Sequence, residues 1–459
     1  MLLKDLPYDK ASPVEIEEYA KKLIGKTFRE ILPDEYKNYK GKGRLGQITE
    51  KYHFKYEPNS DNEPDFNAAG VELKVTPFKE NKRGKKYSAK ERLVLNIINY
   101  MDIVNENFAS STFWRKNKLL LLIFYLYKKE LNRLDYTVEY AQLFEYPEED
   151  LKIIKDDWEK IVNKIREGKA HELSEGDTFY LGACTKGANK RSLRKQPFSD
   201  KLAKQRALSL KNKYMTHVLN DYMIKGKKTY EPIIKNVNDL EDKTFEQYVL
   251  DIINSNHGKS VEELAEEYSV KNTGLKNFAS KVALRMLGVN TKNASEFAKA
   301  NIKVKAIRIE RNGKIKEHMS FPTFKFKEIV QEKWTSSKLR EMFIETKFFF
   351  VIFKFDEDNV LRLHKGMFWN MPLKNLDNEV KKVWRRAVEV INEGIEIRRV
   401  GKRKFNNFPS PSENRVAHVR PHARNRNDTY PLPNGEEFTK QCFWLNNSYV
   451  LDEINKEGV

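Results

Sequence analysis

The feature that most constrains the fold is an internal repeat, in which several short segments recur in the same order roughly 225 to 250 residues apart. The apolar run KLLLLIFYLY is matched by KFFFVIFKF, with Lys118 aligned to Lys347. DDWEKIVNKIREG is matched by KKVWRRAVEVINEG, and in both segments a tryptophan precedes a glycine by ten residues. A single repeat of this length predicts two copies of one domain.

Further segments extend the match toward both ends of each copy. LGACTKGAN, which ends at Asn189, is matched by AHVRPHARN, and RALSLKNKY is matched by QCFWLNNSY. Near the start of each copy, Ser12 precedes Glu15 and Ser260 precedes Glu263 by three residues, a spacing that predicts a capping box at the start of a helix.

These matches predict copies at residues 1–222 and 259–459, joined by a connector at 223–258 that holds a basic stretch and a short helix. In each copy helices alternate with strands, so we expect an α/β fold with a central mixed sheet flanked by helices. The apolar run at 119–127 is too short to cross a bilayer as a helix and predicts a strand buried on both faces. Trp158 and Trp384 are expected in the cores.

Composition points to the kind of partner. The 459 residues carry a net charge of +19, which favours a polyanion, with nucleic acid as the first candidate and an anionic membrane as the second. Two cysteines give neither a disulfide framework nor a zinc cluster, and the first residues lack a signal peptide's apolar core, so we expect a cytoplasmic protein. No phosphate-binding glycine loop occurs, so ATP is not expected as a partner.

The segment PDFNAAGVELKVTPF holds the candidate catalytic residues. Side chains alternate along a strand, so Glu72 and Lys74 lie on one face while the intervening apolar side chains face the core. Taken alone, such a pair is usually a solvated face. Asp65, in the turn-rich entry to the strand, can converge with Glu72, and paired carboxylates suit Mg²⁺. A lysine beside the metal can then orient a water molecule or stabilise charge on a phosphate.

This segment resembles the active-site segment of the MutH family, with the same Asp-x₆-Glu-x-Lys spacing and an intact GVELK. That family comprises a mismatch-repair nicking enzyme and type II restriction endonucleases that cleave at GATC. KGRLGQITE resembles a helix of the family that adds Glu50 and Lys42 to the site. YSAKERLVLNIINY resembles the helix that follows, where Lys90 or Arg92 would contact a phosphate. The two-copy layout is similar to that of restriction enzymes in which a catalytic MutH-like domain is fused to an inactive one.

The second copy lacks the acidic pair. When VELKVT is aligned with IKVKAI, Lys303 replaces Glu72 and Glu296 replaces Asp65, while an apolar segment replaces the region of Glu50. One acid beside two lysines repels a divalent cation, so we expect no catalytic metal in this copy.

Both copies carry a basic segment at an equivalent place. Residues 183–213 hold ten Lys or Arg against one acid, and residues 398–426 hold nine against one, a density that suits phosphate contacts. The family resemblance implies that these segments also reach base edges, and Arg, Lys and Asn are suited to reading guanine and adenine. The candidates are Lys186, Asn189, Arg420, His422, Arg424 and Asn425.

The sequence thus predicts a Mg²⁺-dependent type II restriction endonuclease acting on double-stranded DNA at 5′-GATC, with one active centre. Asp65 and Glu72 would hold the metal with help from Glu50, and Lys74 would position the attacking water. We expect a free monomer. Whether the second copy completes a pseudo-dimer or binds a second site, with dimers or loops on DNA, is left open. The alternatives are a strand-nicking repair enzyme and a DNA-binding protein without activity.

Overall fold

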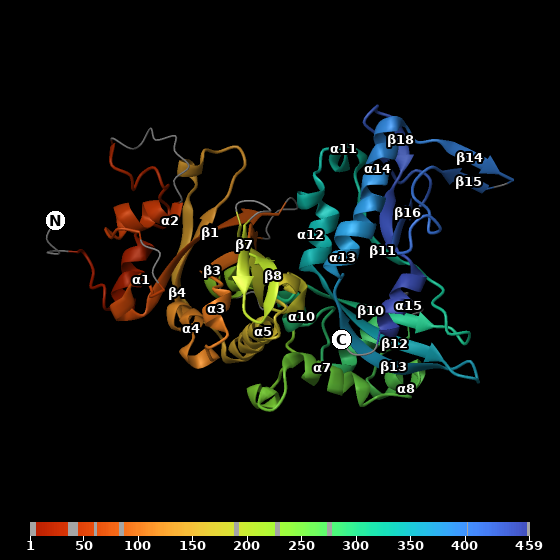
Figure 1. The fold of residues 1–459 in the computed structure, drawn as a ribbon, viewed down its shortest axis with the longest axis horizontal. Helices are drawn as coiled ribbons and strands as arrows, with labels where there is room; N and C mark the ends of the chain where they lie inside the picture. The colour runs from red at the N-terminus through yellow and green to blue at the C-terminus, as the bar shows by residue number, and fades with distance from the viewer. Residues whose placement is uncertain are drawn as a thin grey trace. The chain divides into compact units, whose positions relative to one another are not determined.

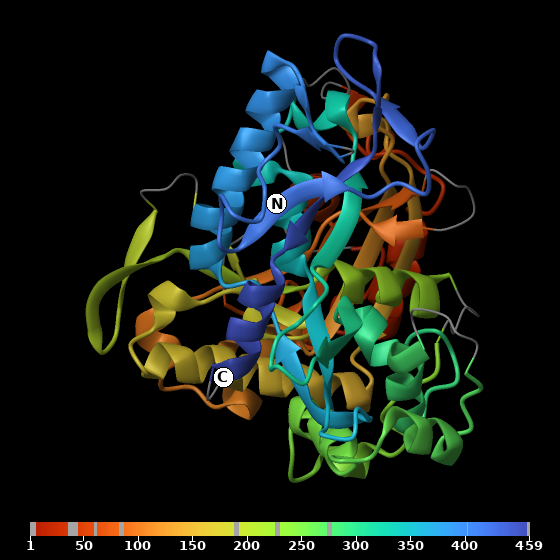
Figure 2. The ribbon, with the colours of Figure 1, turned by 90° about the vertical axis from the view of Figure 1, so that its right-hand side faces the viewer.

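The computed structural model describes residues 6–34, 45–58, 62–81, 87–187, 192–224, 230–272, 278–401 and 403–456. The chain forms two compact units, traced from red to blue in Figures 1 and 2. Unit 1 comprises Met1–Phe245 and Asn293–Asn301, and unit 2 comprises Glu246–Lys292 and Ile302–Val459. The chain therefore passes between units three times. The domain bounds expected from the repeat, 1–222 and 259–459, stay a prediction.

Unit 1 is built on a mixed four-stranded sheet of order β2-β1-β4-β5. Strand β1 runs parallel to β4, and the other two pairs are antiparallel. Strand β4 is buried along most of its length, as its apolar run predicts. No helix in the described part of the chain is both long and apolar enough to cross a membrane. The strands are β1 (Val71–Glu80), β2 (Tyr87–Ala89), β4 (Leu119–Leu126) and β5 (Val138–Glu145).

A second sheet of unit 1 has the order β3-β9-β6 and is antiparallel, with a hairpin beside it. The helix expected around residues 87–100 is wrong, because this stretch forms β2 and β3. In β3, Leu93 and Leu95 are buried and alternate with less buried residues, a period of two that suits a strand packed on one face. The strands are β3 (Leu93–Ile97), β6 (Leu181–Thr185), β9 (Arg206–Leu210), β7 (Leu193–Gln196) and β8 (Ser199–Lys204).

Helices surround these sheets, and α5 carries Trp158 fully buried, as predicted. The neighbouring Asp157 carboxylate accepts the backbone N–H groups of Phe179, Tyr180 and Leu181 at 2.6–2.8 Å, which joins α5 to the start of β6. The helices of unit 1 are α1 (Pro13–Lys21), α2 (Leu45–Ile48), α3 (Tyr100–Ile103), α4 (Thr112–Asn117), α5 (Glu148–Arg166), α6 (Asn212–His217) and α10 (Ser295–Lys299).

Helix α10 is a late part of the sequence that completes unit 1. The Lys299 ammonium lies 2.7 Å from the carboxylate of Asp150 on α5, with side chains only 6% and 0% exposed. The buried Glu296 carboxylate accepts the backbone N–H groups of Ile233 and Ile234 at 2.9 and 3.1 Å. Because buried charges are stable only when paired, these contacts anchor α10 in unit 1.

Unit 2 repeats the plan of unit 1. Its sheet β10-β12-β13 has one parallel and one antiparallel pair, and the antiparallel sheet β11-β19-β16 stands beside it. Helix α14 runs beside β16 and buries Trp384, as predicted (Figure 1). The strands of the two sheets are β10 (Ile302–Ile309), β11 (Met319–Phe324), β12 (Lys347–Phe355), β13 (Leu361–Trp369), β16 (Ala417–Pro421) and β19 (Gln441–Leu445).

The remaining elements of unit 2 are two hairpins and a set of helices. The connector does contain the predicted helix, α7. The hairpins pair β14 (Ile397–Val400) with β15 (Arg403–Asn406) and β17 (Thr429–Pro431) with β18 (Glu437–Thr439). The helices are α7 (Phe245–Asn254), α8 (Val261–Glu267), α9 (Phe278–Met286), α11 (Phe326–Ile329), α12 (Lys338–Glu345), α13 (Leu373–Asn375), α14 (Lys381–Glu393) and α15 (Asn447–Asn455).

Strand register fixes which residues of the two units correspond. The pairing of β4 with β5 shifts register after Phe124, and that of β12 with β13 shifts after Ile352, so Leu119, rather than Lys118, matches Lys347. Leu119 pairs with Val71, and Lys347 pairs with Ile302. The match of Val71 to Ile302 therefore holds, whereas the alignment of the two lysines is out of register by one residue.

The two predicted capping boxes turn out differently. At α8, Ser260 and Glu263 exchange the expected side-chain and backbone hydrogen bonds. At α1, Ser12 accepts the Glu15 N–H, but the Glu15 carboxylate accepts the N–H of Asp9 instead. Only the first half of the motif is therefore present at α1.

Candidate active site

A short loop folds back to place Asp65 beside the start of β1. Phe66 and Val71 exchange backbone hydrogen bonds of 2.9 and 3.3 Å, which close the loop around a turn of 3₁₀ helix. The turn ends at Gly70 with φ of 66°, a left-handed conformation that favours glycine. The glycine of GVELK thus shapes the loop that carries the aspartate.

Asp65 and Glu72 are in direct contact through the backbone. The Glu72 carboxylate accepts the N–H of Asp65 at 3.1 Å, and the Asp65 carboxylate accepts the N–H of Leu73 at 2.9 Å. Glu72 is 2% exposed although it lies on the polar face of β1. The strand therefore holds two acidic groups together at a largely buried place, as the spacing predicts.

Two lysines approach the Glu72 carboxylate. Lys74 Nζ lies 2.5 Å from Oε1, and Lys116 Nζ, on α4, lies 3.7 Å from the same atom. Lys74 was predicted here from the Glu-x-Lys spacing. Lys116 was not, because it lies 44 residues further along the chain in the basic run WRKNK, and only the packing of α4 against β1 brings it to the site.

Glu50 lies in the same electrostatic environment. It follows α2 in a turn of π helix, and a Cβ added at Gly46 would meet its carboxylate at 3.6 Å. Burial, and then the charge of Glu72, raises the pKa of Glu50, while Lys74 and Lys116 lower it. Tyr56 is a further neighbour missed from the sequence. Its buried hydroxyl has no hydrogen-bond partner among the described residues, and burial and the charge of Asp65 raise its pKa.

The carboxyl groups of Asp65 and Glu72 are suited to binding a cation, because without one their negative charges repel. Burial and the charge of Glu72 raise the pKa of Asp65 to about 7, so the two carboxylates repel when both are ionised. A hard divalent cation would relieve this repulsion and takes oxygen ligands of this kind. Within the described ranges no three His, Cys, Asp or Glu side chains are gathered as a metal-binding group. Glu50 as a third ligand stays a prediction.

The other predicted contacts of unit 1 lie as follows. Lys42 and Asn189 fall outside the described residues. Lys90 Nζ lies 4.4 Å from the centre of the Tyr127 ring, a cation–π contact. Arg92 forms an ion pair with Glu175, so its guanidinium already has a partner inside unit 1.

The basic segments of both units share one local geometry. Lys186, just beyond β6, donates its N–H to the carbonyl of Gln205, and His422, just beyond β16, donates to Lys440, both at 2.9 Å. Both side chains are exposed. The predicted base-reading residues Lys186 and His422 therefore occupy equivalent positions, as the sequence match implies.

In unit 2 the basic segment is built around an aromatic ring. The Arg420 guanidinium stacks over the ring of Trp444 on β19 at 5.1 Å, and the His422 ring lies 5.3 Å from it. Arg424 and Asn425 are exposed and lie in the turn that leads to β17. At the position of Arg420, unit 1 carries the buried Cys184, because both residues pair with equivalent positions of β9 and β19.

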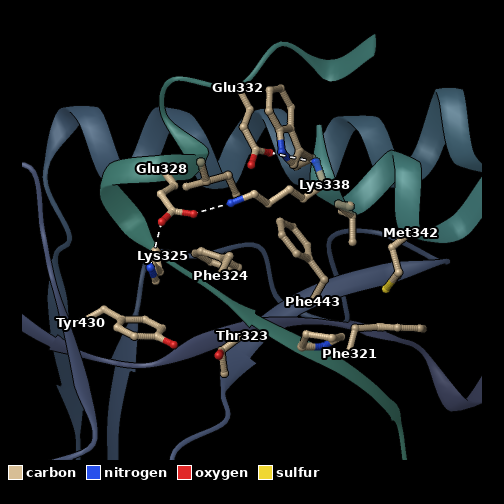
Figure 3. A pocket seen from close by; sticks show the side chains of 14 residues that line it. Phe321, Thr323, Phe324, Lys325, Glu328, Glu332, Lys338, Met342, Tyr430 and Phe443 are labelled. Carbon is tan, nitrogen blue, oxygen red and sulfur yellow. Dashed lines mark hydrogen bonds and ion pairs between the residues drawn. The ribbon is translucent and has the colours of Figure 1, made fainter. Parts of the chain in front are cut away.

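Unit 2 also holds an apolar cavity of about 350 Å³, lined mainly by Phe321, Phe324, Met342, Trp384 and Phe443 (Figure 3). At one side Glu328 pairs with both Lys325 and Lys338. None of the predicted site residues that the structure describes lines this cavity. It is therefore separate from the basic segment and from β10.

Comparison with known proteins shows which family the segment around this site resembles. Residues 54–157, which include Asp65, Glu72, Lys74 and Lys116, match the family described as DNA mismatch repair enzyme MutH. The MutH protein of Shewanella woodyi is 29% identical over 152 residues, which cover 33% of this chain and 63% of that protein.

A relative that matches from end to end is the type II restriction enzyme Sau3AI of Staphylococcus aureus. The identity is 39% over 482 aligned positions, covering 96% of this chain and 97% of that enzyme. Full-length similarity includes unit 2, so the relationship extends beyond the MutH-like segment. The chain belongs to the family of the type II restriction enzyme Sau3AI, and it is a type II site-specific deoxyribonuclease with a MutH-like nuclease domain.

Proposed function

We propose that unit 1 hydrolyses phosphodiester bonds of double-stranded DNA at 5′-GATC with Mg²⁺, and that the second copy contributes recognition without cleaving. The observation that carries this proposal is the contact of Asp65, Glu72 and Lys74 at the start of β1. We infer a free monomer that works without ATP or membrane. The free thiols of Cys184 and Cys442 support a reducing, cytoplasmic setting.

In this mechanism each described side chain has a definite task. Asp65 and Glu72 would hold the divalent cation, with Glu50 assisting from the π-helical turn. Mg²⁺, when bound, supplies a Lewis acid that stabilises charge on the phosphate oxygens. Lys74, whose ammonium group pairs with Glu72 in this structure, would orient the attacking water. Lys116 provides a second positive charge for the scissile phosphate.

Recognition of GATC is proposed to involve the basic segments of both units. Arg420 and Arg424 can each pair with guanine, and the asparagines of the two segments, Asn189 and Asn425, with adenine. Trp444 restricts the guanidinium of Arg420, which lowers the entropy lost when it binds a base. Whether unit 2 completes a pseudo-dimer on one palindrome or binds a second GATC site stays open.

The test is digestion of plasmid DNA with and without GATC methylation, in Mg²⁺ or Ca²⁺, followed by sequencing of the ends. We expect double-strand breaks at GATC in Mg²⁺, ends with a 5′-phosphate, and no cleavage by Glu72→Gln. Cleavage at unrelated sequences, or full activity of Glu72→Gln, would contradict the proposal. Single-strand nicks alone would favour the repair-type alternative, while binding without any cleavage would favour the non-enzymatic one.

A further inference from the structure

Strand β10 of unit 2 carries two lysines where β1 carries its acid and its lysine. The strand register matches Lys303 to Glu72 and Lys305 to Lys74. Glu296, the aligned counterpart of Asp65, belongs to unit 1, where its carboxylate accepts the N–H groups of Ile233 and Ile234. The place of the acidic pair is therefore taken by two positive charges.

These two ammonium groups lack the counter-charge that Lys74 has in unit 1. Neither Lys303 nor Lys305 forms an ion pair or hydrogen bond with a described residue. Lys305 is half-buried and pairs across the ladder with the buried Phe350. Burial and the charge of Lys303 lower the pKa of Lys305. Two unpaired positive charges beside the buried Phe350 destabilise the free protein. An anionic ligand that neutralises them would therefore bind more tightly.

A cavity of about 300 Å³ opens beside Lys305, between β10 and β11. Lys316 and His318 also line it, and burial, followed by the charge of Arg420, lowers the pKa of His318. The cavity volume exceeds that of a phosphate group. Lys305 thus borders this cavity, and Lys303 lies two residues before it on the same face of β10.

Two glutamates line this cavity as well, and their positions matter for the sign of its charge. Glu317 pairs with Arg308 at 3.2 Å, and both side chains are more than half exposed. Glu310 is half-buried beside the turn at 311–313. With Arg308 and Glu317 neutralising each other, Lys305 and Lys316 outweigh the remaining glutamate.

We propose that Lys303 and Lys305 bind a phosphodiester group of DNA, at the position where the first copy would hold its cation. This inference rests on the proposed function only in taking DNA as the ligand. The two lysine ammonium groups would attract the phosphate directly, in place of a metal ion, and this supports binding without hydrolysis. The lost active site would therefore be a phosphate clamp.

The experiment compares two full-length variants of equal charge. Lys303→Gln with Lys305→Met removes the pair, and Lys327→Gln with Lys354→Gln removes two exposed lysines elsewhere in unit 2. Binding to a labelled GATC duplex and to a scrambled duplex is measured by anisotropy in Ca²⁺ across a salt series. Each lost phosphate contact lowers the slope of log affinity against log salt by about 0.9 and weakens binding several-fold.

For the pair variant we expect roughly tenfold weaker binding to both duplexes and a slope reduced by about 1 to 2. The matched control should stay within about twofold of the parent with an unchanged slope. Lys305→Met should also raise the urea midpoint of the free protein, since it removes a half-buried charge while keeping a side chain of similar shape. Equal losses in both variants, or an unchanged slope in the pair variant, would overturn the proposal.

A direct readout accompanies the binding curves. Mass spectrometry after lysine acetylation should show Lys303 and Lys305 protected by DNA, with Lys327 and Lys354 modified as in the free protein. Equal modification of all four lysines would also overturn the proposal. Plasmid cleavage is scored separately. If the protein fails to cut GATC but shows this protection, the proposed reaction is refuted, whereas phosphate binding by Lys303 and Lys305 is supported.

Discussion

Replacing Asp65 by asparagine should stabilise the metal-free protein while it abolishes cleavage. The raised pKa of Asp65, from 3.8 to about 7, means that ionisation of this carboxyl opposes folding. At about 1.4 kcal/mol for each tenfold change in the ionisation constant, the cost reaches about 4 kcal/mol above pH 7. The asparagine side chain would carry no charge, and its oxygen could still accept the N–H of Leu73.

The sign of this effect follows from the direction of the pKa. An acid whose pKa is raised by folding is harmless below its unfolded value, near pH 4. It destabilises the protein progressively until the pH has passed the folded value, near 7. The advantage of Asp65→Asn over the parent should therefore grow by about 2.5 kcal/mol between pH 5 and pH 8. Mg²⁺ should remove much of that advantage by stabilising the parent alone.

The assay is equilibrium unfolding in urea with EDTA at both pH values, followed by circular dichroism. Labelling of Cys184, which is buried on β6, identifies the transition that belongs to unit 1. Asp200→Asn, at an exposed position of β8, is the control and should show no such change. A relative stability of Asp65→Asn that is flat or falls with pH would refute the reasoning.

Four other substitutions test separate contacts. Glu72→Gln should abolish cleavage in Mg²⁺ and leave DNA affinity in Ca²⁺ within about threefold, checked by anisotropy. Lys116→Met should slow single-turnover cleavage roughly 10- to 100-fold with little effect on affinity; an unchanged rate would remove this lysine from the site. Trp444→Ala should reduce the preference for GATC over a scrambled duplex, because Arg420 loses its stacking partner. Lys299→Met should destabilise unit 1 by about 3 to 5 kcal/mol in urea unfolding, because it leaves a buried carboxylate unpaired.

The sequence could predict those features that depend on local pattern. Alternation along GVELK placed Glu72 and Lys74 on one face, and the repeat predicted that the second copy would also contain a mixed sheet. The register of the repeat was harder. An apolar run fits a buried strand equally well when shifted by one residue, so only the register shifts after Phe124 and Ile352 fixed the match of β4 to β12.

Features formed by distant packing escaped prediction. Lys116 reaches Glu72 only because α4 packs against β1, and nothing in WRKNK distinguishes it from a surface lysine. Residues 87–97 were expected to be helical from family resemblance. In β3, however, buried and less buried residues alternate with a period of two, which suits a strand with one face packed in the core. Local pattern therefore predicted the acidic pair and Lys74, whereas the position of Lys116 could be found only from the fold.

The return of the chain to unit 1 at residues 293–301 affects the order in which the protein can mature on the ribosome. Asp150 acquires its partner Lys299 only after 149 further residues have been synthesised, by which time the first segment of unit 2 has already left the decoding centre. Unit 1 is thus completed only after synthesis of unit 2 has begun. A gene that ends before residue 293 would therefore encode a unit 1 without α10 and without the partner of the buried Asp150.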